Sequence, residues 1–173
     1  IIRIREEAKK TSIDEVIVLK HLKALEIHYG IALDDIQKTA VVEAILNNIV
    51  VITGSQGTRK TIDTRFINEC YKSLFPKNGR IFLAPTGRAA RKITEATGEE
   101  AYTVHSYLHI YDEDPMPEDK IEISDSLVLI DESSMIDVNV AHTLFDAIGN
   151  GCTVVIVGDI DQLPSVGPGA VLR

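Results

Sequence analysis

Short apolar runs alternate along this chain with longer segments of helical spacing, and this alternation constrains the fold more than any other feature. The runs predict buried strands at residues 49–53, 81–84, 127–130 and 153–157. The segments between them predict helices at residues 61–75, 87–97 and 138–148. Strands that alternate with helices form parallel βαβ units. We therefore expect an α/β fold with a mostly parallel sheet and helices on both faces.

Two more helices are predicted upstream of the first strand. The sequence Ser12-Ile13-Asp14-Glu15 has the spacing of a capping box and predicts a helix that continues to about His28, and residues 34–47 predict the second. We expect residues 1–32 to form an N-terminal helical segment and residues 33–173 to form the main domain. The acidic, proline-containing stretch 112–120 predicts an exposed loop. Because the chain lacks an initial methionine and ends after a Gly- and Pro-rich stretch, we expect a piece of a longer protein.

Composition excludes several classes of protein, and the charge is distributed unevenly along the chain. The 173 residues hold no apolar run near the roughly 20 residues that span a bilayer, so we expect no membrane association and a cytoplasmic location. Two cysteines far apart, Cys70 and Cys152, predict neither a disulfide framework nor a zinc site. The net charge is −8, yet residues 59–92 carry nine basic and two acidic side chains. The charge of this segment is therefore compatible with a nucleic-acid partner, although the net charge of the whole chain is not.

A glycine-containing loop follows the first predicted strand and leads into a helix, which is the context of a phosphate-binding loop. In such a loop, backbone N–H groups face the phosphates, Lys60 neutralises phosphate oxygens, and the Thr61 hydroxyl holds Mg²⁺. The usual pattern has glycine just before the lysine, where this chain has Arg59. The predicted nucleotide-binding residues here are Gly54, Ser55, Gln56, Gly57, Thr58, Arg59, Lys60 and Thr61.

Polar residues follow the other strands, where ligands of open α/β sheets bind. Asp131 and Glu132 follow the third strand and suit metal coordination and activation of water, although acids also decorate ordinary helix starts. Gln162 follows the fourth strand and suits γ-phosphate sensing, although its Gly- and Pro-rich surroundings also fit a rigid turn. The Thr86 hydroxyl after the second strand suits a DNA phosphate, with an ordinary helix cap as the alternative.

Three sequence motifs together resemble a known family. They are APTGRAA at 84–90, DESSM at 131–135 and GDIDQLPSVGPG at 158–169. With these motifs, residues 33–172 resemble the first RecA-like motor domain of RecD-like helicases, a superfamily 1B group that includes the exodeoxyribonuclease V alpha chain. The resemblance implies a RecA-like P-loop NTPase fold. It also implies an ATP-dependent 5′-to-3′ DNA helicase that uses ATP and Mg²⁺ and translocates on single-stranded DNA.

The resemblance also implies roles for individual residues. Gln37 would recognise adenine, and Lys60, Glu132 and Gln162 would be catalytic, with Glu132 as the base and Gln162 as the γ-phosphate sensor. Thr61 and Asp131 would hold Mg²⁺. The residues implied to line the single-strand path are Pro85, Thr86, Gly87, Arg88, Thr103 and His105.

Two features make the chain unusual for this family. Arg59 replaces the loop glycine and Ser55-Gln56 replace a usual Gly-Pro pair, which keeps open an alternative, a DNA- or subunit-binding module that no longer binds ATP. The second feature is the expected truncation. A helicase of this kind closes ATP between two RecA-like domains, the second of which supplies an arginine finger, and we expect this chain to contain only the first. The implied partners are therefore a second motor domain of the same protein, single-stranded DNA and other exonuclease subunits. We expect the chain alone to be inactive or nearly so.

Overall fold

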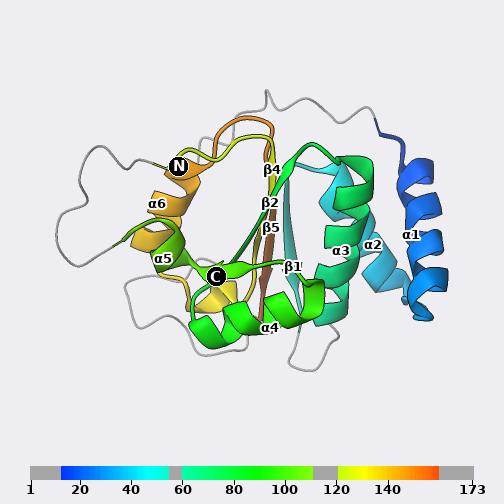
Figure 1. Ribbon diagram of the computed structural model, residues 1–173, viewed down its shortest axis with the longest axis horizontal. Helices are drawn as coiled ribbons and strands as arrows, with labels where there is room; N and C mark the ends of the chain where they lie inside the picture. The colour runs from blue at the N-terminus through cyan, green and yellow to red at the C-terminus, as the bar shows by residue number, and fades with distance from the viewer. Residues whose placement is uncertain (1–12, 55–59, 111–120, 160–173) are drawn as a thin grey trace.

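A computed structural model describes residues 13–54, 60–110 and 121–159, and in these ranges the strands form one parallel sheet (Figure 1). The strand order is β1-β5-β4-β2-β3, and every neighbouring pair is parallel. The strands are β1 (Ile49–Thr53), β2 (Gly79–Ala84), β3 (Ala101–Thr103), β4 (Ser126–Ile130) and β5 (Thr153–Gly158). The predicted α/β class and the predicted strands are confirmed.

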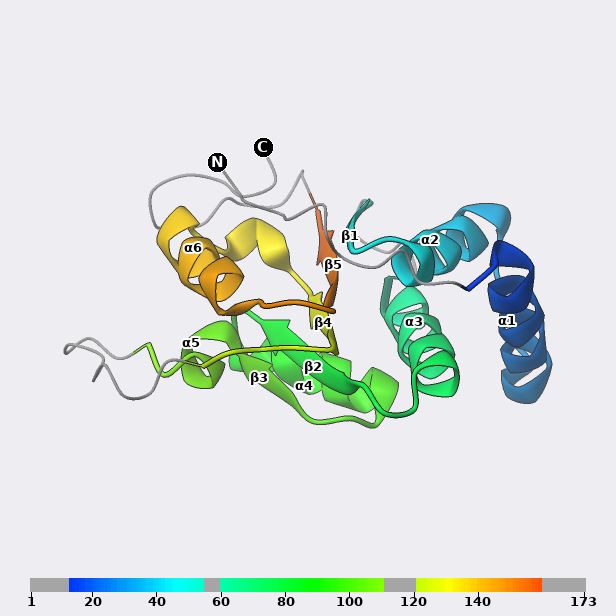
Figure 2. The same cartoon turned by 90° about the horizontal axis from the view of Figure 1, so that it is seen from above.

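Helices cover both faces of this sheet (Figures 1 and 2). Leu127 and Leu129 of β4 face one side, and Val128 and Ile130 face the other, because successive side chains of a strand alternate. The first core contains residues of α1 (Glu15–Tyr29), α2 (Asp35–Leu46), α3 (Lys60–Leu74) and α4 (Gly87–Thr97). The second core contains residues of α5 (Val104–Tyr107) and α6 (Val138–Ala147).

The helix starts follow short polar caps, as the sequence suggests, with one correction. Asp14 caps α1, since its carboxylate accepts a hydrogen bond from the Val16 backbone at 3.2 Å. The predicted capping role of Ser12 falls on a residue outside the described ranges, and the cap of α1 is two residues later. The helix ends at Tyr29, where Gly30 adopts φ 63°, a left-handed conformation that glycine accepts readily.

Two short elements, β3 and α5, were not predicted from the sequence. β3 spans three residues and α5 spans four, so neither is long enough to show a hydrophobic period. None of the described helices combines the length and the apolar character that crossing a membrane requires. The division of the chain at residue 33 stays a prediction, although Val18 and Leu22 of α1 pack into the same core as α2 and α3.

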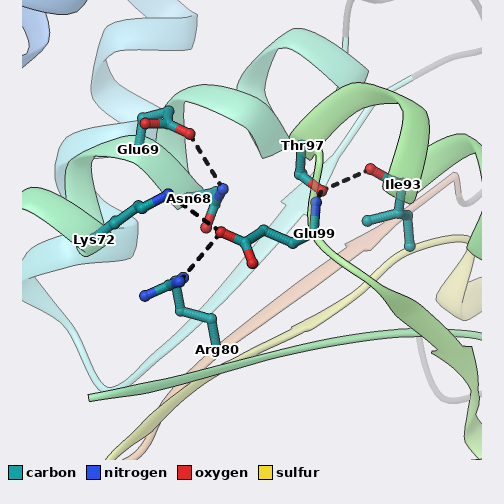
Figure 3. Close-up of polar contacts among 7 residues, drawn as sticks. All are labelled: Asn68, Glu69, Lys72, Arg80, Ile93, Thr97 and Glu99. Carbon is teal, nitrogen blue, oxygen red and sulfur yellow. Dashed lines mark hydrogen bonds and ion pairs between the residues drawn. The ribbon is translucent and has the colours of Figure 1, made fainter. Parts of the chain in front are cut away.

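An ionic cluster joins three elements at the amino-terminal end of β2 (Figure 3). The Glu99 carboxylate, just after α4, accepts hydrogen bonds from Arg80 of β2 at 3.1 Å and from Lys72 of α3 at 3.5 Å. Arg80 and Glu99 are largely buried, with side chains 19% and 27% exposed. The cluster therefore ties α3 and α4 to the sheet at the end opposite the carboxyl ends of the strands.

Candidate functional site

The carboxyl ends of β1, β5 and β4 lie side by side, which is where open α/β sheets bind ligands. The register pairs Thr53 of β1 with Gly158 of β5, so the glycine loop and the loop after β5 begin next to each other. The other neighbour of β5 is β4, which leads directly to Asp131. Three of the predicted strand-end groups thus start from one edge of the sheet.

Lys60, the first residue of α3, reaches across this edge to the end of β5. Its ammonium group donates a hydrogen bond to the Gly158 carbonyl at 3.0 Å and lies 4.0 Å from an oxygen of Asp159. The Lys60 side chain is 17% exposed and that of Asp159 is 3% exposed. Lys60 and Gly158 are 98 residues apart in the chain, so the fold makes this contact.

Asp159 was not selected from the sequence. A signal for it existed, since it is the first carboxylate of the motif that follows β5 and stands at a strand end. Its proximity to Lys60 makes it part of the candidate site.

Asp131 continues β4 by one residue, because its backbone N–H still bonds the Leu83 carbonyl of β2 at 3.0 Å. One Asp131 carboxylate oxygen accepts a hydrogen bond from the Glu132 backbone at 2.7 Å. Burial raises the pKa of Asp131, and the Glu132 carboxylate adds to the rise, while that backbone bond and the charges of Lys60 and Lys92 oppose it. Lys60 contacts the end of β5 and Asp131 follows β4, the neighbouring strand, so the two predicted residues lie at the same edge of the sheet.

Glu132 has an unusual backbone, with φ 51° and ψ 34°. This left-handed conformation is uncommon for a residue with a side chain, and it turns the chain sharply between β4 and the short 3₁₀ helix η1 (Ser133–Met135). The Glu132 carboxylate makes no capping bond to η1 and contacts the Lys92 ammonium at 3.3 Å. The buried Ser133 hydroxyl donates to the Val157 carbonyl at 2.8 Å and anchors the turn to β5.

Gln37, predicted to recognise adenine, is 6% exposed and is held by protein groups. It forms a reciprocal capping box with Asp34 at the start of α2. Its side-chain amide also donates to Asp63 of α3 at 2.7 Å, which links α2 to the helix that follows the phosphate loop. In the structure Gln37 joins α2 to α3, and adenine recognition by this residue stays a prediction.

The residues predicted to line the DNA path lie at the ends of β2 and β3, which are neighbours in the sheet. Thr86 caps α4 by accepting from the Ala89 backbone at 3.2 Å, and Thr103 caps α5 by accepting from Ser106 at 3.1 Å. The alternative role of Thr86, an ordinary helix cap, is therefore present in the structure. Flanking Thr86 and Thr103 are half-buried Pro85 and exposed Gly87, Arg88 and His105.

The described basic side chains of residues 60–92 do not form one surface, so only some of them are placed to contact a nucleic acid. The Arg65 guanidinium lies 4.0 Å from the centre of the Tyr29 ring, between α3 and α1. Lys72 and Arg80 belong to the ionic cluster around Glu99. Among the described residues of this segment, the exposed cations near the carboxyl ends of the strands are those of α4, namely Arg88, Arg91 and Lys92.

Several predicted site residues lie outside the described ranges: Ser55, Gln56, Gly57, Thr58, Arg59 and Gln162. Exposed Thr61, in the first turn of α3, and Asp131 offer a hydroxyl and a carboxylate, the hard oxygen donors that Mg²⁺ prefers. Among the described residues, no group of three or more His, Cys, Asp or Glu side chains could hold a metal ion. The two oxygens fit Mg²⁺ sites that nucleotide phosphates and water complete.

Comparison with known proteins places these features in a family. A family model described as an AAA domain matches residues 37–168. The chain is 36% identical over 136 residues to the ATP-dependent RecD2 DNA helicase of Deinococcus radiodurans, a match that covers 73% of this chain and 17% of that protein. It is 37% identical over 128 residues to the ATP-dependent DNA helicase dda of Enterobacteria phage T4, covering 69% of this chain and 29% of that protein.

Two further matches agree. The chain is 30% identical over 160 residues to the RecBCD enzyme subunit RecD of Mycobacterium tuberculosis, covering 80% of this chain and 28% of that protein. The crystal structure of Pif1 helicase from Candida albicans superposes with a TM-score of 0.62 at 25% identity, covering 79% of this chain and 34% of that one. The chain thus spans less than a third of the length of these curated relatives. The predicted resemblance to RecD-like helicases and the RecA-like fold are confirmed.

Proposed function

Because this chain belongs to the AAA domain family and is similar to RecD-like helicases, we propose that it is the ATP-binding half of a 5′-to-3′ DNA helicase. In this proposal ATP hydrolysis drives translocation on single-stranded DNA. The observation that carries it is that Lys60 contacts the end of β5 while Asp131 and Glu132 follow β4, the neighbouring strand, together with a family match over those residues.

Each group at this edge has a chemical task in the proposal. Lys60 exchanges its bond to the Gly158 carbonyl for phosphate oxygens and neutralises their charge. Thr61 and Asp131 hold Mg²⁺, which when bound withdraws charge from the phosphate oxygens. Glu132 accepts a proton from the attacking water. Gln162, three residues after Asp159 in the same motif, orients that water and senses the γ-phosphate.

The DNA path in this proposal crosses the ends of β2 and β3. Backbone N–H groups at the start of α4 and the exposed Arg88 side chain contact phosphates, and Thr103 and His105 extend the path. Contacts of this kind bind the backbone and not the bases, so the domain binds single strands of any sequence.

In our proposal, a complete helicase also needs a second domain and partner subunits. A second RecA-like domain closes over ATP and supplies the arginine finger, which in related enzymes contributes about 10³ to 10⁵ in rate. Other exonuclease subunits are candidate partners, since one relative is a RecBCD enzyme subunit. A cytoplasmic location is also part of this proposal.

A second candidate function rests on Arg59, which stands where the loop pattern has glycine. A side chain there crowds a backbone that must approach phosphate closely, and it favours a module that binds DNA or a subunit without ATP. The experiment is an equilibrium titration of a fluorescent ATP analogue with Mg²⁺.

For the ATP-binding function we expect saturable binding that Lys60→Ala abolishes and that Arg59→Gly tightens by at least about tenfold, or about 1.4 kcal/mol. Binding in the Arg59→Gly variant alone would favour the second candidate. Equal or weaker binding after Arg59→Gly would show that the arginine assists the phosphates, and no binding in either protein would overturn the ATP-binding function.

A further inference from the structure

Among the described residues, the Glu132 carboxylate forms one ion pair, and its partner comes from a distant helix. Lys92 of α4 places its ammonium group 3.3 Å from Glu132 Oε1, across 40 residues of sequence. The turn that carries Glu132 offers its side chain no capping bond. The same ammonium group is close enough to lower the pKa of the neighbouring Asp131. Lys92 therefore lies at the acidic pair of the proposed ATPase site.

Lys92 also belongs to the helix whose start is the proposed DNA contact. Arg88 and Lys92 are four residues apart on α4, so they lie on the same side of the helix, one turn from each other. The opposite side is fastened to the core by Ala89, Ala90 and Ile93, all buried. In Figure 1, α4 runs along the end of the sheet where the carboxyl ends of the strands lie. An anion bound near Arg88 is thus within one helical turn of the group that holds Glu132.

We propose that Lys92 is a positioning residue that holds Glu132 when DNA is absent and releases it when a DNA phosphate takes the Lys92 ammonium group. The inference rests on the proposed function, since it assumes that Glu132 is the base and that DNA binds along α4. Released from Lys92, the carboxylate is free to turn toward the attacking water. DNA binding and readiness of the base are in this way coupled through one side chain.

The exposure of the pair makes such an exchange feasible. The Lys92 side chain is 56% exposed and that of Glu132 is 26% exposed, so solvent and a phosphate can both reach the contact. Exposed ion pairs are weak, and a change in one partner alters the equilibrium by about two- to fivefold. A single phosphate can therefore compete with Glu132 for Lys92, which a strong buried pair would not allow.

The proposal predicts an energetic link that can be measured without ATP hydrolysis. If Glu132 and DNA compete for Lys92, Glu132→Gln frees the ammonium group and tightens DNA binding. This gain must disappear when Lys92 is already absent. We would measure binding of a fluorescent oligothymidylate by anisotropy at low salt, without nucleotide, for the wild type, Glu132→Gln, Lys92→Gln and the double variant.

Two matched variants separate this link from simple charge effects. Glu95→Gln removes a carboxylate from an exposed position of the same helix without breaking an ion pair with Lys92, and it measures the general effect of one charge. Lys92→Arg keeps a cation at position 92 and should preserve the gain from Glu132→Gln, which a purely steric role of lysine would not. Circular dichroism confirms that each variant is folded.

We expect Glu132→Gln to tighten binding by about two- to fivefold in the wild-type and Lys92→Arg backgrounds and to have no more effect than Glu95→Gln in the Lys92→Gln background. A gain of the same size with and without Lys92, or no gain at all, overturns the proposal while the wild type still binds DNA. Absence of DNA binding by the wild type overturns the proposed DNA contact itself, and this inference with it.

Discussion

The left-handed backbone conformation of Glu132 should lower the stability of the folded domain, and this cost can be measured. A residue with a side chain pays about 1 to 2 kcal/mol in the left-handed region, where Glu132 has φ 51° and ψ 34°. Asparagine tolerates this region because its short side chain bonds the local backbone, whereas glutamine does not. Both replacements remove the ion pair with Lys92, worth about 0.2 to 1 kcal/mol, so its loss cancels when the two variants are compared.

We expect Glu132→Asn to be more stable than Glu132→Gln by about 0.5 to 1 kcal/mol. For a domain of this size the difference corresponds to about 1 to 4 °C in Tm. Urea unfolding and thermal circular dichroism both measure it.

The matched control is the same pair of variants at Glu95, an exposed position inside α4. Asparagine is the poorer helix former, so there we expect the opposite order, with Glu95→Gln the more stable. If Glu132→Asn proved no more stable than Glu132→Gln while the order at Glu95 held, the argument that the Glu132 backbone is strained would be wrong.

Three further outcomes are expected. Arg88→Gln should weaken single-stranded DNA binding equally for different sequences and reduce the slope of log affinity against log salt by at most about one unit, and unchanged anisotropy titrations would place the DNA path elsewhere. Burial raises the pKa of Asp63, so the charge of this carboxylate opposes folding at neutral pH. The Asp63→Asn variant can still accept the hydrogen bond from Gln37 and should therefore raise the free energy of unfolding at pH 7. This gain in stability should shrink as the pH falls through the raised pKa of Asp63. A gain independent of pH in urea titrations would contradict this reasoning. Steady-state phosphate release with single-stranded DNA should be negligible for the isolated chain even after Arg59→Gly, and several turnovers per second, abolished by Glu132→Gln, would show that one domain holds the complete site.

Local sequence patterns were sufficient for most of the fold and for placing the main groups of the candidate site at one edge of the sheet. The strands were predictable because a strand buried on both faces needs an almost continuous apolar run, as in the fully buried β4 and β5. Lys60, Asp131 and Glu132 were predictable because they follow such runs, and parallel strands deliver the residues after them to one edge. The start of α1 was misjudged because two polar residues near it, Ser12 and Asp14, both suit a cap.

Contacts between distant segments were decided only by the tertiary structure. No local pattern places β5 between β1 and β4, joins Lys60 to the Gly158 carbonyl, or pairs Lys92 with Glu132. The charge of segment 59–92 likewise favoured a nucleic-acid partner, but Lys72 and Arg80 pair with Glu99, at the end of α4 opposite Arg88. Periodicity records which side of its own element a residue occupies, because that depends on backbone geometry over a few residues. Which element it then meets depends on packing of whole helices and strands against each other, and that information is spread over the entire chain.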